Sequence, residues 1–368
     1  MILIRSYLLG FVGSSIVSIS GFAQTPAPAS SPAATAKPEP SASPTTESLI
    51  NSMNAADLQQ AVQLLKNNYI KPDALNENEL SRATLQGMLT RLGHGVMLLP
   101  PHGAGNAESA SPFFGEILES HIGYLRLGAL TRENLQKMDA TLQGFIAKKI
   151  DALVIDLRAS SSADDFATAA EYAKRFCPNG KALFSLRKAN AKQDRSFTSD
   201  REPTYKGLVI ALTDSETSGA AEAVAGVLRL YDKALLLGDA TAGRSVEYSD
   251  LPLPSGIQLR IAIAEALLPE GRALFPDGLK PDVPVEMPLP DKHQVFQQSI
   301  DKGMAQFVYE NERPHLNEAA LLAGRNPDIE SAEAAQRRVR STEKPPLHDR
   351  VLQHAVDVVT SLAIYEKR

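Results

Sequence analysis

Two short runs of apolar residues constrain the fold of this chain more than any other feature of its sequence. Ala152–Ile155 and Leu208–Leu212 contain no polar side chain. Such runs are typical of strands buried on both faces, as in parallel sheets covered by helices. Segments 132–148 and 164–176, one on each side of the first run, are predicted to be helices. The alternation of strand and helix therefore predicts an α/β fold.

The same alternation continues beyond the second run and is flanked by helical segments. Further strands are predicted at 122–127, 234–237 and 258–264, and a helix is predicted to carry Ala221, Val224, Ala225 and Leu228 on one face. Before the core, residues 48–100 are predicted to be helical. Their amphipathic face has apolar residues at helical spacing, Leu58, Ala61, Val62 and Leu65, and a second helix is predicted at 80–92. After the core, helices are predicted at 291–309 and 347–365.

The N-terminal residues resemble an export signal followed by a linker. Arg5 is the only early charge, an uncharged run reaches Phe22, and the small residues around Ala23 fit a cleavage site. Residues 24–47 are rich in Pro, Ala, Ser and Thr, a composition that cannot offset chain entropy by apolar burial. We therefore predict a signal peptide at 1–23, a linker at 24–47, and export to a periplasm or the cell exterior. An uncleaved membrane anchor is the alternative.

Composition excludes several classes of function. Hydrophobic residues make up 43% of the 368 residues, as is usual for a soluble globular protein, and the net charge of -5 argues against nucleic acid as the main partner. The single Cys177 excludes an intrachain disulfide and is interpreted as a buried structural thiol. Because no Cys/His cluster is present, we predict neither a metal site nor a cofactor.

Three segments carry a resemblance to a known family. They are Asp214–Glu222, Gly238–Arg244 and Gly278–Val283. Together they resemble the C-terminal processing (tail-specific) serine peptidases, whose nucleophile opens a helix and whose general base is a Lys after a strand ending in Gly-Glu or Gly-Asp. The resemblance implies a Clp-peptidase/crotonase-like core (β-β-α type) at 118–288, between helical segments at 48–117 and 289–368. Too few residues separate Pro101 from Ile122 for the PDZ module that the family usually carries.

The resemblance assigns the nucleophile position to Gly219 and the general-base position to Arg244. A Ser/Lys dyad needs an oxygen nucleophile and a Lys that can be neutral near pH 7. Glycine has no side chain, and a guanidinium keeps its proton in proteins. Arg244 is predicted either to bind a carboxylate with two hydrogen bonds or to pair with a nearby acid such as Asp239 or Glu247. Conventional proteolysis is thus not expected.

The loop after the strand ending in Asp156-Leu157-Arg158 also lacks residues that the family uses for catalysis. Ser162 and Ala163 occupy the glycine positions whose amides help to form the oxyanion hole, and residues with a Cβ disfavour the positive φ that such amides often need. Asp156 and Arg158 could themselves be purely structural. Ser218 is the fallback nucleophile, although we predict that it caps the helix or lies in its first turn.

Two main functions are consistent with these residues. The leading hypothesis is an exported, catalytically inactive relative that acts as a peptide-binding or scaffolding module, with a peptide or protein as its ligand and no integral membrane domain after signal cleavage. The alternative is a serine-type hydrolase that uses Ser218. A structural role in the envelope is a third hypothesis, and an acyl-CoA enzyme is disfavoured by the export signal. The sequence leaves the oligomeric state open.

Overall fold

The computed structural model describes residues 45–101, 111–160, 165–189, 191–308 and 347–366. The predicted signal peptide and nearly all of the predicted linker lie outside these residues, so both stay predictions. The described residues fall into two compact units, which divide between Glu77 and Asn78. Within the described residues, no helix is long and apolar enough to cross a membrane.

The first unit contains the helices α1 (Thr46–Ser52) and α2 (Ala55–Asn68). Helix α2 begins with a capping box in which Asn54 and Asp57 satisfy each other's backbone N–H groups. The helix that the apolar spacing predicted is therefore present. Its apolar face is not buried, however, because Leu58, Val62 and Leu65 are 41%, 45% and 54% exposed. In α3 (Glu77–Leu92), which lies mainly in the second unit, no residue is buried either.

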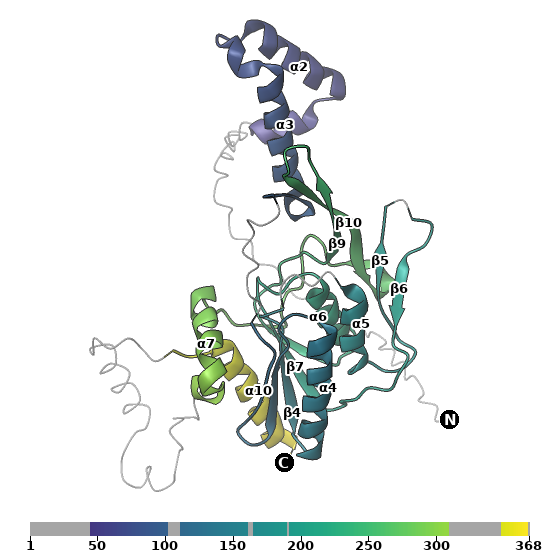
Figure 1. Ribbon diagram of the computed structural model, residues 1–368, viewed down its shortest axis with the longest axis vertical. Helices are drawn as coiled ribbons and strands as arrows, with labels where there is room; N and C mark the ends of the chain where they lie inside the picture. The colour runs from purple at the N-terminus through teal and green to yellow at the C-terminus, as the bar shows by residue number, and fades with distance from the viewer. Residues whose placement is uncertain (1–44, 102–110, 161–164, 190, 309–346, 367–368) are drawn as a thin grey trace, which may run out of the picture. The chain divides into compact units, whose positions relative to one another are not determined.

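The second unit contains a largely parallel six-stranded sheet with the order β12-β8-β7-β4-β3-β2 (Figure 1). The strands are β2 (Phe114–Leu118), β3 (Ile122–Arg126), β4 (Ala152–Asp156), β7 (Leu208–Thr213), β8 (Leu235–Gly238) and β12 (Val283–Pro284). Only β2 pairs in the antiparallel direction. The two apolar runs of the sequence are the neighbouring central strands β4 and β7, which confirms the predicted α/β class.

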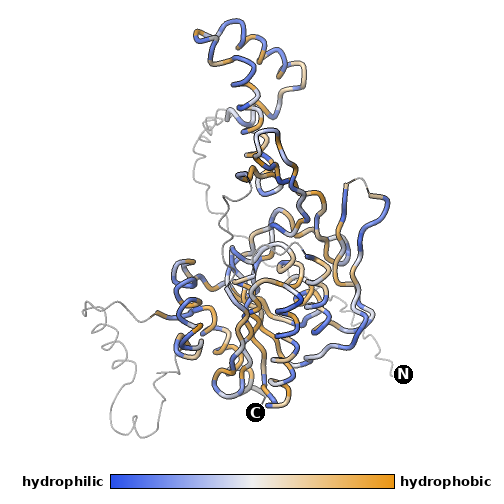
Figure 2. Tube along the Cα trace, viewed as in Figure 1, coloured by the Kyte–Doolittle hydropathy of each residue, from blue (hydrophilic) through white to orange (hydrophobic). Residues whose placement is uncertain are grey.

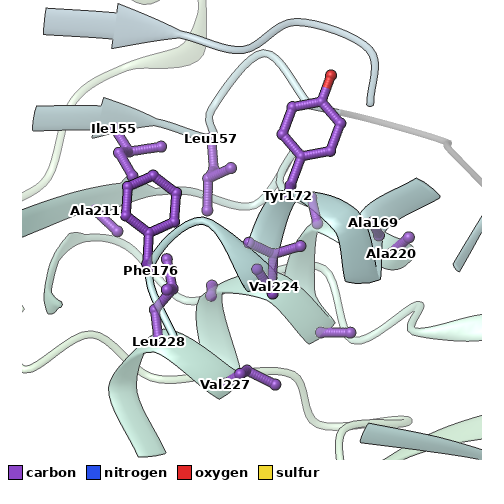
Figure 3. Close-up of a cluster of buried hydrophobic side chains, with 14 of the residues drawn as sticks. Ile155, Leu157, Ala169, Tyr172, Phe176, Ala211, Ala220, Val224, Val227 and Leu228 are labelled. Atoms are coloured by element: carbon purple, nitrogen blue, oxygen red, sulfur yellow. The ribbon is translucent and has the colours of Figure 1, made fainter. Parts of the chain in front are cut away.

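Helices cover both faces of this sheet. One face packs against α4 (Arg132–Ala147), α5 (Phe166–Lys174) and α6 (Ala220–Leu230), and the other against α7 (Leu289–Lys302) and α10 (Arg350–Glu366). Successive residues of β4 alternate between the two cores, with Leu153 in the first and Val154 in the second. Figure 2 shows the sheet as the most hydrophobic part of the trace. Figure 3 shows the first core, where Tyr172 and Phe176 of the α5 region approach Val224 and Leu228 of α6.

A second, antiparallel sheet was not foreseen from the sequence. It has the order β1-β10-β5-β6, and two further strands also pair with β10. Its members are β1 (Val96–Leu99), β5 (Ala182–Arg187), β6 (Arg195–Thr198), β9 (Val246–Pro252), β10 (Gln258–Leu268) and β11 (Arg272–Ala273). Strands β1 and β2 lie in the segment 48–117 that was predicted to be helical. The predicted helix 291–309 is also shorter than expected, since Gly303 ends α7 with a positive φ of 79°.

The C-terminal helix is attached to the main sheet by a buried ion cluster, which we call the Arg158 cluster. The Arg158 guanidinium, 1% exposed, pairs with Asp156 at 2.6 Å and with Asp349, directly before α10, at 2.7 Å. The Tyr124 hydroxyl donates to Asp156 at 2.8 Å. Both residues thus join the sheet to the C-terminal helix, and the interpretation that they are purely structural stays a prediction.

We expect Asp349→Ala to lower the free energy of unfolding by about 3–5 kcal/mol, because it removes one of two anions from a buried cation. Urea unfolding followed by circular dichroism measures this change. The matched control is Asp301→Ala at an exposed position of α7, which should change stability by less than about 0.5 kcal/mol. A similar effect of both variants would show that the Arg158 cluster does not attach α10.

Candidate functional site

The loop between β7 and α6 has an unusual backbone at the position assigned to the nucleophile. Gly219 precedes the first residue of α6 and has φ 63° and ψ -130°. Residues with a Cβ rarely adopt this conformation, whereas glycine adopts it readily. Such a sharp strand-to-helix turn is also the geometry that exposes a nucleophile in other hydrolases. The turn is thus present, but its central residue has no reactive group.

Ser218 does not cap helix α6. The N-cap residue is Gly219, and no side chain makes a capping hydrogen bond there. Ser218 lies one position earlier, is 8% exposed, and donates its backbone N–H to the carbonyl of Ser160 at 3.4 Å. The prediction that Ser218 is a cap or first-turn residue is therefore wrong, because the positive φ of Gly219 sets the helix start. Its role as a fallback nucleophile stays a prediction.

Glu222 joins helix α6 to the segment that carries the base position. Its side chain is fully buried and accepts three hydrogen bonds, from Thr241 Oγ1 at 2.6 Å and from the backbone N–H groups of Gly243 and Arg244 at 2.7 and 2.8 Å. Thr241 Oγ1 in turn accepts from Leu279 N at 2.8 Å. We call these five residues the Glu222 cluster. It connects all three segments on which the family resemblance rests.

Two glycines let these segments approach so closely. Gly243 has φ 65°, and a Cβ placed on it would lie 1.9 Å from the carbonyl oxygen of Pro276. Gly278 has φ 70°, and its Cβ would lie 2.7 Å from the carbonyl oxygen of Thr241. Real Cβ contacts are never this short, so no other residue fits either position without a shift of the backbone. The close approach explains the Gly-Leu-Lys-Pro-Asp-Val sequence that ends the core.

Arg244 is exposed, although its backbone is held by Glu222. Neither of its predicted acidic partners binds it: Glu247 pairs with Arg195 at 2.8 Å, and Asp239 accepts from the backbone of Ala240. Among the residues that the structure describes, none forms an ion pair with the Arg244 guanidinium. Glu247 therefore pairs with cations of the second sheet, and the general prediction that Arg244 pairs with a nearby acid stays a prediction. Burial, followed by the charge of Arg244, lowers the pKa of His94.

The oxyanion-loop positions are only partly described. Ser162 and Ala163 lie outside the described residues, so their role stays a prediction. The residues on their N-terminal side contact the β7–α6 loop, where Thr217 Oγ1 donates to Leu157 O at 3.2 Å and Ser160 accepts from Ser218. The loop after β4 and the loop after β7 thus lie side by side, as the carboxyl ends of neighbouring parallel strands must.

Neither the single cysteine nor a cluster of metal-ligating residues adds reactive chemistry in the part of the chain that the structure describes. Cys177 is buried, and burial raises its pKa to about 12, as expected for a structural thiol. No group of three or more His, Cys, Asp or Glu residues within the described ranges could hold a metal ion. The prediction that the protein needs no cofactor stays a prediction.

Comparison with known proteins identifies the core. Residues 121–285 match the model of peptidase family S41. The chain is 26% identical over 199 residues to a carboxy-terminal-processing protease of Bartonella bacilliformis, and 23% identical over 185 residues to a carboxyl-terminal-processing protease of Synechocystis. These matches cover 50% and 49% of this chain and 44% and 43% of the relatives, so the chain spans less than half the length of either relative.

Solved structures of similar shape include a putative peptidase from Parabacteroides merdae and a putative S41 protease from Bacteroides fragilis. The TM-scores are 0.49 and 0.43, at 17% and 18% identity. The matches cover 66% and 54% of this chain and 85% and 56% of those chains. The family match confirms the resemblance found in the sequence: the core of this chain is a domain of peptidase family S41, the C-terminal processing serine peptidases.

We expect Glu222→Ala to lower the free energy of unfolding by about 3–5 kcal/mol, because it leaves one hydroxyl and two backbone N–H groups buried without an acceptor. Glu222→Gln keeps one carbonyl oxygen and should cost less. Urea unfolding measures both, with Glu133→Ala as the control, since Glu133 is exposed and pairs only with Lys137. If Glu222→Ala were no more harmful than Glu133→Ala, the Glu222 cluster would not hold the site together.

The Glu222 cluster also predicts a pH dependence of stability. Burial raises the pKa of Glu222 above the ordinary glutamate value, despite its three hydrogen bonds. The folded state therefore holds this proton more tightly than the unfolded chain does, and the stabilisation is lost as the pH rises from the unfolded to the folded pKa. Across that interval the native protein should lose stability relative to Glu222→Gln. Unfolding of both proteins at several pH values tests the sign, and a relative gain would contradict it.

Proposed function

We propose that this protein is an exported peptide-binding module that uses the cleft of a C-terminal processing peptidase without Ser/Lys proteolysis. The observation that carries the proposal is a contrast between the backbone of the site, which is well ordered by the Glu222 cluster and the turn at Gly219, and its side chains. The backbone N–H groups of Gly243 and Arg244 are held by the buried Glu222 carboxylate, and Gly219 keeps the sharp turn, yet the two reactive side chains are missing. Such an arrangement supports binding more than chemistry.

The residue types at the two assigned positions argue against proteolysis. Gly219 offers no oxygen to attack a carbonyl, and the Arg244 guanidinium cannot accept the proton of a nucleophile. In a comparable serine peptidase, loss of the nucleophile alone lowers turnover on the order of a million-fold. Restoring geometry elsewhere in the site does not replace a missing nucleophile.

Arg244 supplies a new binding group at the position of the base. Its guanidinium is exposed and has no ion-pair partner among the described residues. A guanidinium binds a carboxylate through two parallel hydrogen bonds, which an ammonium cannot do. A peptide with a free C-terminal carboxylate is therefore the ligand that we propose for this end of the cleft.

The proposal of export rests on residues 1–23 and the linker at 24–47. A charge-poor apolar run followed by small residues is typical of a signal peptide, and a Pro/Ala/Ser/Thr-rich segment is typical of a tether. Export leads to a periplasm or to the cell exterior, where peptide tails of other exported proteins are available as ligands.

The first test is labelling by a serine-reactive fluorophosphonate. The purified native protein should not be labelled, whereas Gly219→Ser/Arg244→Lys should gain labelling because it restores both reactive groups. Serine at the φ of Gly219 costs about 1–3 kcal/mol, so thermal melting of the double variant is measured in parallel. Labelling of the native protein that disappears in Ser218→Ala would overturn the proposal in favour of a hydrolase with a shifted nucleophile.

The second test concerns the ligand. We expect a fluorescein-labelled peptide with a free C-terminal carboxylate to bind more tightly than the same peptide with a C-terminal amide. Arg244→Ala should weaken binding of the free acid by about 10-fold or more and leave the amide unchanged, since a charge-assisted pair contributes about 1.5–3 kcal/mol. Fluorescence anisotropy measures both. The control is Arg272→Ala, another exposed arginine, and equal effects of the two variants would exclude the proposed role of Arg244.

A further inference from the structure

Lys292 is a buried lysine that neither the family resemblance nor the proposed binding group accounts for. It lies in the first turn of α7 and is 1% exposed. Its ammonium group donates to Arg158 O at 3.1 Å, to Asp214 Oδ2 at 2.6 Å and to Glu216 Oε2 at 2.5 Å. An ammonium has three N–H donors, and all three are used. No donor is left for a ligand, so any role of Lys292 in the site acts through these acceptors.

The three acceptors belong to the two loops that border the site. Arg158 follows β4 and leads into the oxyanion loop, whereas Asp214 and Glu216 lie between β7 and α6. Asp214 Oδ1 also accepts from the backbone of Glu216 at 2.9 Å and of Thr217 at 3.2 Å, so the same carboxylate shapes the second loop. Lys292 therefore touches both loops at one point.

The loop after β7 is also hydrogen-bonded to the segment that carries the general-base position. The carbonyl of Thr217 accepts from Ala242 N at 3.0 Å, two residues before Arg244. Beside Lys292 lies a small cavity of about 60 Å³ at the carboxyl ends of β7 and β8, lined by Thr213, Ser215 and Asp239 among others. Lys292 and Asp214 both line this cavity, so their ion pair lies at its wall.

We propose that Lys292 is a positioning residue of the candidate site, which holds the loop after β7 against Arg158 at the end of β4. Removal of its charge would leave Asp214, 8% exposed, without a cation, and would leave Arg158 and the loop after β7 without their common donor. The loop after β7 would then open more often, although the sheet beneath it stays folded. The consequence for peptide affinity rests on the proposed function, whereas the loop geometry does not.

A reporter thiol tests the geometry without any ligand. Ser218→Cys places a thiol in the second loop, and native Cys177 contributes no background because it is buried and burial raises its pKa to about 12. In this parent, Lys292→Met should increase the rate at which the thiol at position 218 reacts with an aromatic disulfide reagent by about 10-fold or more. The reason is that the loop after β7 opens more often. Lys302→Met, an exposed lysine on the same helix, should leave the rate unchanged.

A second control separates positioning from stability. Val295→Ala creates a cavity beneath α7, at a buried residue that touches neither loop through a hydrogen bond, and should lower the melting temperature without changing the thiol rate. Equal acceleration by Val295→Ala, or no acceleration in folded Lys292→Met, would overturn the proposal. If Lys292→Met does not fold, Glu216→Gln takes its place with an expected acceleration of about threefold, and an unchanged rate there would also overturn it.

The labelled free-acid peptide separates this inference from the proposed function. Lys292→Met should weaken its binding by about the factor by which the thiol rate rises, because only the closed form of the loop after β7 makes the proposed binding site. If the parent protein did not bind the peptide, the proposed function would fail and the thiol result would still decide the role of Lys292. If the peptide bound normally to Lys292→Met despite faster labelling, Lys292 would not position the cleft.

Discussion

One buried carboxylate, that of Glu222, sets the arrangement of the core around the site. Three donors from a different segment of the chain converge on it, and two of them are backbone N–H groups, which only a substitution by proline would remove. Because Glu222 is buried, the loss of its carboxylate would leave these donors without their acceptor. The segment 238–244 is therefore fixed relative to α6, and with it the positions of Gly219 and Arg244. The glycines at 243 and 278 are the steric condition for this contact.

The other side of the site depends on the C-terminal part of the chain. The Arg158 cluster contains Asp349, which is 191 residues from Arg158 in the sequence. Lys292 joins Arg158, at the end of β4, to the loop after β7. The candidate site therefore has two supports, the Glu222 cluster on the face of α6 and the contacts of α7 and α10 on the opposite face. A core cut at residue 288 would keep the first support and lose the second.

The sequence predicted those elements whose pattern is local. The buried strands β4 and β7 and the helices α4 and α6 were found because continuous apolar runs and helical spacing are visible within a few residues. The second sheet was missed, since β5, β6 and β9 are short and mixed in polarity, and their pairing with β10 joins distant segments. Tertiary pairing of this kind leaves no periodic signal in the sequence.

In the candidate site, too, the features that depend on local sequence could be predicted and those that depend on long-range contacts could not. Motif spacing predicts the positions of Gly219 and Arg244, whereas it does not predict the three hydrogen bonds of Glu222, the last residue of the first motif segment. The signal was present, since Glu222 is the only charged residue in the otherwise small and apolar first two turns of α6. Lys292 gave no such signal, because a lysine in the first turn of a polar helix is usually exposed. Long-range ion pairs cannot be read from one sequence without knowing which elements meet.

The backbone of Gly219 has an evolutionary consequence. A serine at this φ and ψ stores about 1–3 kcal/mol of strain, which an active peptidase tolerates in return for catalysis. Glycine adopts the same conformation without that strain. In a lineage under selection for binding alone, the change from serine to glycine is therefore a gain in stability, and the reverse change begins with a loss. Selection for stability would then preserve the shape of the site and oppose the return of its nucleophile.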